Sequence, residues 1–147
     1  MARNGLFGSS RKGEHGFTLI ELLVLILIIG VLGAIALPLF INQRTKAQDT
    51  SAKTALRTAA EAIEIYHQEN DTFAGASVAA LVQIEPALGE ARNLVVAGTA
   101  SGYSLSAESA AGAQGGGPYM LKYTMGVATE RTCAAAGRGG CPASGDW

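Results

Sequence analysis

The sequence is poor in charged residues and in cysteine, and these absences exclude several classes of protein. Only 16% of its 147 residues are charged, and eleven Lys and Arg stand against twelve Asp and Glu, for a formal net charge of −1. A chain without a basic excess has no broad positive field, which argues against a strong nucleic-acid binder. Two cysteines are too few for a disulfide-rich scaffold or a four-cysteine zinc site. The length allows one domain with an appendage, and the 48% of hydrophobic residues exclude a disordered protein.

The hydrophobic residues are concentrated in one segment near the N-terminus. Between Phe17 and Ile41, eighteen of twenty-five residues are Leu, Ile, Val or Phe, and Glu21 is the single ionisable side chain. As a helix, this segment exceeds the ~30 Å thickness of the hydrocarbon core of a bilayer. Its large apolar side chains favour insertion by roughly 5–11 kcal/mol, whereas Glu21, close to the segment's start, opposes it by at most about 3 kcal/mol. The segment therefore predicts a membrane span.

An ordinary single-span anchor and a cleaved secretory signal are the competing interpretations of this segment. The signal interpretation uses the basic stretch 1–12 and a cut after Ala36, which ends an A-x-A triplet. Against it, the apolar run is longer than in most signal peptides, Glu21 interrupts its start, and Pro38 lies just past the cut. Three Lys or Arg precede the segment and four follow it closely, so the positive-inside rule does not orient it.

The residues at the start of the segment resemble the processing and methylation signature of type IV pilins and pseudopilins. A short basic leader, residues 1–16, ends in Gly16, Phe17 follows, and Glu21 stands five residues after the glycine. The resemblance implies that a prepilin peptidase cuts between Gly16 and Phe17 and methylates the new amine of Phe17. It also implies that Glu21 meets the Phe17 amine of a neighbouring subunit and sets the axial register of a filament. The alternative is that Glu21 extends to the lipid headgroups unpaired.

Gly30, Gly33 and Pro38 interrupt the apolar helix. Proline lacks a backbone N–H and clashes with the carbonyl four residues earlier, so a kink or loosening is expected at Pro38. Glycine and proline are also simply common in membrane helices. The resemblance implies more, namely that the stretch from Gly30 to Pro38 melts into extended chain within an assembled filament.

The remainder of the chain predicts a helix followed by a small sheet. Apolar residues recur at helical spacing between residues 42 and 70, which predicts an amphipathic helix that rests on its own domain: Ala52, Leu56, Ala59, Ile63 and Tyr66. A short helix is expected over residues 78–84, and strands over 93–97, 103–107 and 119–125. The expected fold is α+β and pilin-like, with a long N-terminal helix packed on a small antiparallel sheet. The predicted divisions are the leader 1–16, a membrane or filament-core helix 17–41, an amphipathic helix 42–70, and a head 71–147.

Cys133 and Cys141 enclose a short Ala/Gly-rich loop near the C-terminus. The resemblance implies that they form a disulfide, since the family commonly carries a C-terminal cysteine pair. Such a bond would stabilise a small head by roughly 2–3 kcal/mol and would place the head in an oxidising compartment outside the cytoplasm. Two free thiols are the alternative.

The sequence lacks the common motifs for catalysis and cofactor binding. The sequence contains no nucleophile-elbow, kinase, P-loop or dinucleotide motif. After removal of the leader, His67 is the single histidine, and one Glu64-x-x-His67 pair is too little for a di-iron site. We therefore expect no enzyme activity, no cofactor and no metal.

The interpretation that accounts for these features is a structural subunit of a type IV pilus-like filament. The expected partners are identical subunits, the prepilin peptidase, a membrane assembly platform with its motor ATPase, and membrane lipid before assembly, with no direct nucleic-acid partner. The precursor is expected in the cytoplasmic membrane with its head outside, and the product in a cell-surface filament. One alternative is a pseudopilin of a type II secretion or DNA-uptake system, and another is an anchored binding domain that never polymerises.

Overall fold

The computed structural model describes residues 16–147, so the predicted leader lies outside the described residues apart from Gly16. The described chain divides into two units, one ending at Leu37 and the other comprising Pro38–Trp147. The long helix α1, Leu19–Asn70, contributes to both units. The second unit, Pro38–Trp147, is the head, and it contains the C-terminal half of α1 in addition to the predicted head residues 71–147.

The two ends of α1 follow from local chemistry. Thr18 caps the N-terminus, because its Oγ1 accepts a hydrogen bond from the Glu21 N–H at 3.2 Å. The helix consequently begins at Leu19, two residues later than the apolar pattern predicts. At the other end, Asp71 adopts a left-handed conformation with φ +56° and its N–H donates to the His67 carbonyl at 2.8 Å. This left-handed residue ends the helix at Asn70, which is also the predicted end of the amphipathic helix 42–70.

The first unit carries the apolar half of α1. Its large apolar side chains are all exposed, from 45% at Val24 to 83% at Leu19. The best 18-residue window of α1 has a mean hydropathy of 3.0, so the helix is long and apolar enough to cross a membrane. Gly30, Gly33 and Pro38 all lie within continuous helix. The melting of this stretch concerns an assembled filament, and both it and the kink at Pro38 stay predictions.

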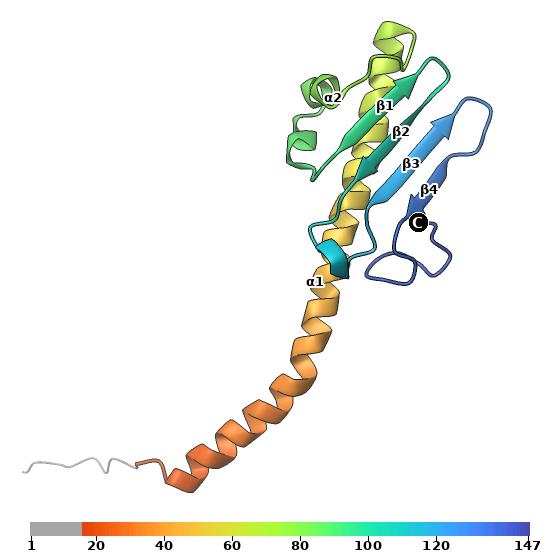
Figure 1. Ribbon diagram of the computed structural model, residues 1–147. Coiled ribbons are helices and arrows are strands. Elements are labelled where there is room, and N and C mark those ends of the chain that lie inside the picture. Colours follow the sequence, from red (N-terminus) through yellow and green to blue (C-terminus); the bar gives the residue numbers. More distant parts are fainter. Residues whose placement is uncertain (1–15) are drawn as a thin grey trace, which may run out of the picture. The chain divides into compact units, whose positions relative to one another are not determined.

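The head contains one four-stranded antiparallel sheet in the order β1-β2-β3-β4 (Figure 1). The strands are β1 Val95–Thr99, β2 Gly102–Ala107, β3 Tyr119–Thr124 and β4 Glu130–Cys133. The pairing of Tyr103 with Tyr123 and of Leu105 with Leu121 fixes the register of the two central strands. The three predicted strands are present within two residues of their expected ends. The sequence pattern did not locate β4, which is short and mostly polar.

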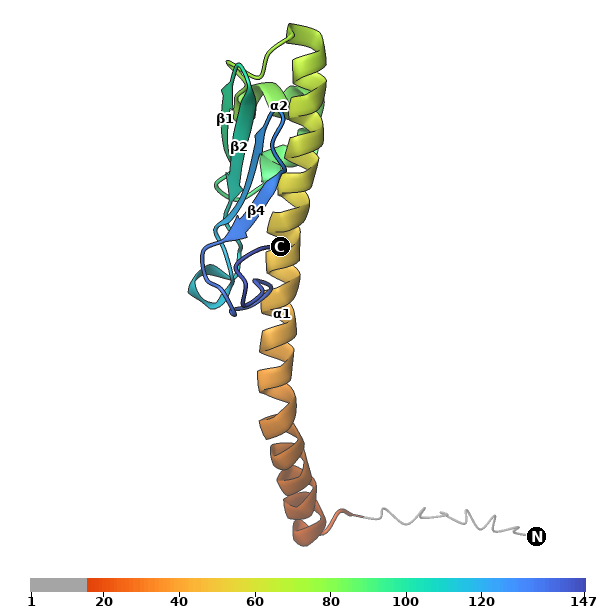
Figure 2. The same cartoon turned by 90° about the vertical axis from the view of Figure 1, so that its right-hand side faces the viewer.

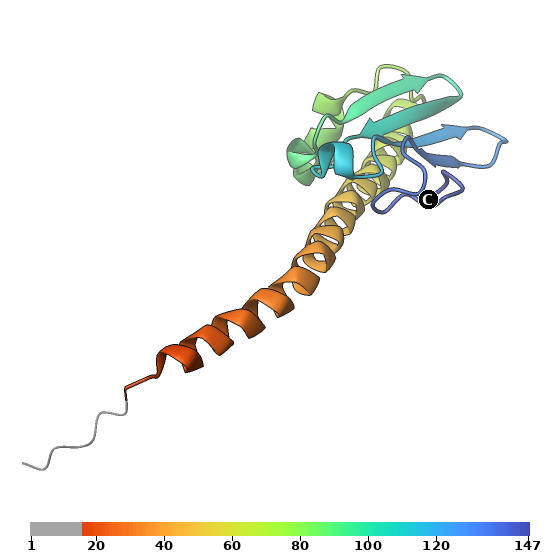
Figure 3. The ribbon, with the colours of Figure 1, turned by 60° about the horizontal axis from the view of Figure 1, so that its bottom comes forward.

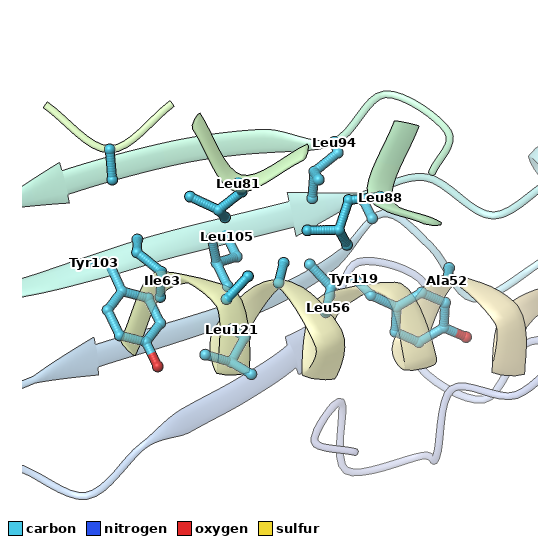
Figure 4. Packing of buried hydrophobic residues seen from close by; sticks show 14 of the residues in the cluster. Ala52, Leu56, Ile63, Leu81, Leu88, Leu94, Tyr103, Leu105, Tyr119 and Leu121 are labelled. Atoms are coloured by element: carbon cyan, nitrogen blue, oxygen red, sulfur yellow. The ribbon is translucent and has the colours of Figure 1, made fainter. Parts of the chain in front are cut away.

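The core of the head lies between the sheet and the C-terminal half of α1, which run side by side in Figures 1 and 2. Leu56 and Ile63 of α1 are fully buried and share one apolar cluster with Leu105 and Leu121 of the sheet (Figure 4). The predicted stripe is confirmed, since four of its five members are buried and Tyr66 is partly buried. Each fully buried leucine or isoleucine stabilises the head by roughly 1.5–3 kcal/mol.

Two short helices cover one side of this core. They are α2, Val78–Ile84, and the 3-10 helix η1, Pro86–Glu90. Ser77 caps α2 by accepting a hydrogen bond from the Ala80 N–H, and Leu81 and Leu88 insert into the core. The expected short helix is therefore present with its predicted bounds, and the α+β fold expected from the sequence is confirmed.

Candidate functional site

The predicted processing site lies in the chain just before α1. Gly16 and Phe17 have no regular secondary structure. The Phe17 side chain is 78% exposed, and a Cβ added to Gly16 would meet no atom within 4 Å. The peptide bond between the two residues is consequently unobstructed within the described chain, as a substrate of a peptidase requires.

Glu21 lies in the first turn of α1, one turn after Phe17. It is the third helical residue, and its backbone N–H is the group that Thr18 caps. The N-terminus of a helix carries a partial positive charge, which stabilises a carboxylate in the first turn. The fold therefore presents Phe17 and Glu21 at the same end of one helix. The pairing of Glu21 with a neighbour's amine stays a prediction.

The head holds a second polar site, at Asp49, that the sequence analysis did not identify. Asp49 is fully buried on α1, and its Oδ2 accepts two backbone hydrogen bonds. One comes from the Gly116 N–H at 2.9 Å and the other from the Gly140 N–H at 2.7 Å. These donors belong to two loops that are far apart in the sequence. A single carboxylate thus ties the helix to both loops.

Glycine is required in these loops because they approach the carboxylate so closely. A Cβ on Gly139 would lie 2.1 Å from Asp49 Oδ2, and a Cβ on Gly115 would lie 2.5 Å from Oδ1. Gly139 also has φ +52°, a conformation that residues with side chains rarely adopt. The clustering of glycine near the C-terminus is thereby explained in part, since any larger residue would push the loops off Asp49.

The surroundings of Asp49 favour its charged form. Burial alone would raise the pKa of Asp49, but the Gly140 and Gly116 N–H donors, assisted by the nearby Ser109 hydroxyl, outweigh it and lower the pKa. Lys53 Nζ donates to the Gly140 carbonyl at 2.5 Å. Burial lowers the pKa of Lys53, while the charge of Asp49 opposes this effect. Lys53 and Asp49 therefore partly compensate each other's charge.

The buried hydroxyl of Tyr119 lies beside Asp49 at this site. Burial and the neighbouring Asp49 raise the pKa of the Tyr119 hydroxyl. Neither the Tyr119 hydroxyl nor Asp49 Oδ1 completes a hydrogen bond of standard distance and angle within the described chain, although both atoms are buried. We therefore assign the stabilisation of the carboxylate chiefly to the two backbone donors on Oδ2.

A signal for Asp49 is present in the sequence. Asp49 precedes Ala52 by three residues and Leu56 by seven, so it continues the apolar stripe with the same alternation of three and four. A charged residue at the phase of a buried stripe must be paired or hydrogen-bonded. Its partners were not predictable, because both are backbone groups of irregular loops.

Cys133 and Cys141 form a disulfide, with their Cα atoms 5.9 Å apart. The bond closes the loop that delivers Gly140 to Asp49. The same region holds Trp147, whose indole N–H donates to the Thr132 carbonyl at 2.9 Å and whose ring meets Tyr119 edge-on at 5.9 Å. The disulfide therefore ties the C-terminal loop to β4, and the Asp49 contact ties the same loop to α1.

Replacing both cysteines by serine is expected to lower the free energy of unfolding by about 2–3 kcal/mol, because the unfolded chain regains the freedom that a short closed loop removes. The measurement is urea unfolding of the detergent-solubilised chain, followed by the fluorescence of its single tryptophan, Trp147. A reducing agent should produce the same shift in the wild type and none in the double variant. Equal stability of oxidised wild type and double variant would contradict the prediction.

Within residues 16–147, no group of three or more His, Cys, Asp or Glu side chains is arranged to hold a metal ion. Asp49, the buried acid, is already bound by backbone donors. The described residues thus show two separate features. The first is an exposed apolar helix that begins beside the predicted processing site, and the second is a head held together by a disulfide and a buried carboxylate.

Comparison with known families identifies the first of these features. Residues 11–37 match the family model described as the prokaryotic N-terminal methylation motif. The match begins before the described residues and ends at the last residue of the first unit. The chain therefore carries this motif, and the resemblance inferred from Gly16, Phe17 and Glu21 is confirmed.

Several curated proteins are similar to the chain over part of their length. The type IV major pilin protein PilA of Myxococcus xanthus is 41% identical over 60 residues, which are 41% of this chain and 27% of that protein. The type II secretion system core protein G of Pseudomonas aeruginosa is 35% identical over 63 residues, 43% of this chain and 44% of that protein. The type IV wide pilus major component PilA4 of Thermus thermophilus is 36% identical over 73 residues, 50% of this chain and 55% of that protein.

The aligned regions thus span between about a quarter and about half of these relatives' own lengths. No solved structure matches the chain significantly.

Proposed function

We propose that this chain is a structural subunit of a type IV pilus-like extracellular filament. The observation that carries the proposal is the methylation motif over residues 11–37, which includes most of the exposed apolar part of α1, in a chain that also contains a folded head. Exposed apolar surface of this extent needs a covering, which lipid supplies in a membrane and identical helices supply in a polymer. Head-to-tail association that does not close on itself turns one interface into a fibre.

In this proposal the precursor spans the cytoplasmic membrane through residues 17–41, with the head outside. The disulfide supports an oxidising location for the head. A prepilin peptidase cuts after Gly16 and methylates Phe17, and an assembly platform with its motor ATPase extracts the subunit into the filament. The mature chain has eight Lys and Arg against eleven Asp and Glu, so the assembled heads carry a modest negative charge. We assign the chain no enzymatic role.

A pseudopilin of a secretion system is the second candidate. The similarity to a type II secretion system core protein G favours it, at 35% identity over 63 residues. The disulfide favours the pilin, because the cysteine pair is the feature by which the resemblance separates many pilins from major pseudopilins. Electron microscopy and gel electrophoresis of sheared surface material separate the two candidates. A pilin should appear as long surface filaments in the micrographs and as the dominant protein band on the gel.

The mature N-terminus tests the proposal directly. Mass spectrometry of the chain from its native membrane should find a polypeptide that begins at N-methylated Phe17. Replacing Gly16 by Val should block the cut, because the bulkier side chain occupies the position that glycine leaves open. An intact leader on the wild-type protein, or a cut after Ala36, would refute the proposed processing and favour an anchored or secreted domain.

A further inference from the structure

The head has a polar hollow beside the N-terminal end of its part of α1. The hollow measures about 480 Å³. One wall is α1, through Asn42, Thr45 and Lys46, and the other consists of Gln114 and the loop 137–139. In Figure 3 the C-terminal loop, drawn in dark blue, passes close to α1. The hollow is formed entirely by residues of one unit.

The charge lining this hollow is positive. Lys46 and Arg138 both contribute to its walls, and no acidic residue does. Asp49 lies next to Gly139, which lines the hollow. The Asp49 carboxylate is bound by the Gly116 and Gly140 N–H groups, and its charge is offset by Lys53. Lys46 and Arg138 therefore act on the hollow without a neighbouring counter-charge among the residues that line it. Such a lining suits an anion, and the planar guanidinium of arginine suits phosphate oxygens in particular.

The position of the hollow along α1 points to the source of that anion. Phe40 and Ile41, directly before Asn42, are 67% and 51% exposed. A second hollow, of about 250 Å³, combines these two apolar side chains with Arg44, and it shares Thr45 and Gln114 with the first. The lining thus changes from apolar to cationic within about one helical turn. This change is typical of a segment at the boundary between hydrocarbon and headgroups.

We propose that the hollow of Lys46 and Arg138 binds the phosphate of an anionic phospholipid of the membrane that holds the precursor. The acyl chain of that lipid lies along Phe40 and Ile41. The inference rests on the proposed function, because it requires residues 17–41 to span a bilayer. The same Asp49 contacts that anchor the loop around Gly139 also hold Arg138 in the wall of the hollow.

The test is native mass spectrometry of the full precursor, released from detergent after exposure to equal amounts of phosphatidylglycerol and phosphatidylcholine. The wild type should retain phosphatidylglycerol in preference. The double variant Lys46→Gln with Arg138→Gln should lose this retention by roughly 10- to 30-fold, the effect of two cations at a membrane surface. The matched control, Arg92→Gln with Lys122→Gln, removes two exposed cations elsewhere on the head and should retain the lipid as the wild type does.

Three outcomes would overturn the inference. They are equal retention of the two lipids by the wild type, equal losses in the two double variants, and displacement of phosphatidylglycerol by inorganic phosphate at the lipid's concentration. The last would make the hollow a site for free phosphate. The measurement needs no assembly, so a precursor that retains phosphatidylglycerol but forms no filament refutes the proposed function alone. A precursor that forms filaments but does not select phosphatidylglycerol refutes this inference alone.

Discussion

The Asp49→Ala variant is expected to lose about 2–5 kcal/mol of the free energy of unfolding. The change leaves the Gly116 and Gly140 N–H groups buried without an acceptor, and each such group costs roughly 1–3 kcal/mol. It also opens a space between α1 and the two glycine loops. Because a small domain is stabilised by only about 5–15 kcal/mol, this loss is a large share of the total. Urea unfolding monitored by Trp147 fluorescence measures it.

Two variants control this experiment. Glu61→Ala removes an exposed acid from the same helix and should change stability by less than about 0.5 kcal/mol. Asp49→Asn keeps one acceptor oxygen and should lie between Asp49→Ala and the wild type at neutral pH. Asp49→Ala with wild-type stability would show that the two loops are held without the carboxylate.

The same site makes stability depend on pH. The pKa of Asp49 is lowered from its ordinary value of 3.8, so the folded head favours the carboxylate more than the unfolded chain does. The stabilisation is therefore fully present above that ordinary value and is lost as the pH falls below it, through the folded pKa. The difference between the wild type and Asp49→Asn should stay constant from neutral pH to about pH 5 and shrink below pH 4.

The Glu21→Ala variant is expected to abolish filament assembly or to slow it severely. In the proposed filament, the Glu21 carboxylate meets the Phe17 amine of a neighbour in an apolar core. An ammonium left there without its counter-charge is strongly unfavourable. The head is a separate unit that does not contain Glu21, so its folding should be unchanged. Electron microscopy of sheared surface material measures the filaments, and the Trp147 unfolding curve checks the head.

Thr18→Ala separates the charge of Glu21 from its place in the helix. Thr18 caps the N–H of Glu21, so its replacement weakens the start of α1 by about 1 kcal/mol and leaves the carboxylate intact. Filaments that persist in Thr18→Ala and vanish in Glu21→Ala would support the ion pair. Normal filaments from Glu21→Ala would overturn the assignment of register to this residue.

Much of the fold was predictable because its signals are periodic or local. The apolar stripe of α1 predicted which helix face is buried, and the predicted amphipathic helix 42–70 ends at the residue where α1 ends. The short strand β4 was missed because it is mostly polar and gains its pairing from Tyr119 and its neighbours in β3. The start of α1 was misplaced by two residues, since the Thr18 cap is a property of one hydroxyl and not of the apolar pattern.

Of the candidate sites, one was predictable from the sequence and two were not. Gly16, Phe17 and Glu21 form a linear motif, and a peptidase that reads an extended peptide depends on their order in the chain alone. Asp49 and the hollow of Lys46 and Arg138 depend on loops around Gly116 and Gly139 that meet α1 from distant positions in the sequence. No spacing rule links these residues, because irregular loops have no repeat.

The sequence by itself determined the apolar helix, the processing motif at its start and the α+β character of the head. These properties depend on the order and hydropathy of neighbouring residues, which the chain carries whether or not it is folded. The tertiary structure alone decided that Asp49 is buried and bound by backbone donors, and that Arg138 lies beside Lys46. A buried carboxylate needs donors that close around it, and only the packing of two glycine loops against α1 brings such donors to it.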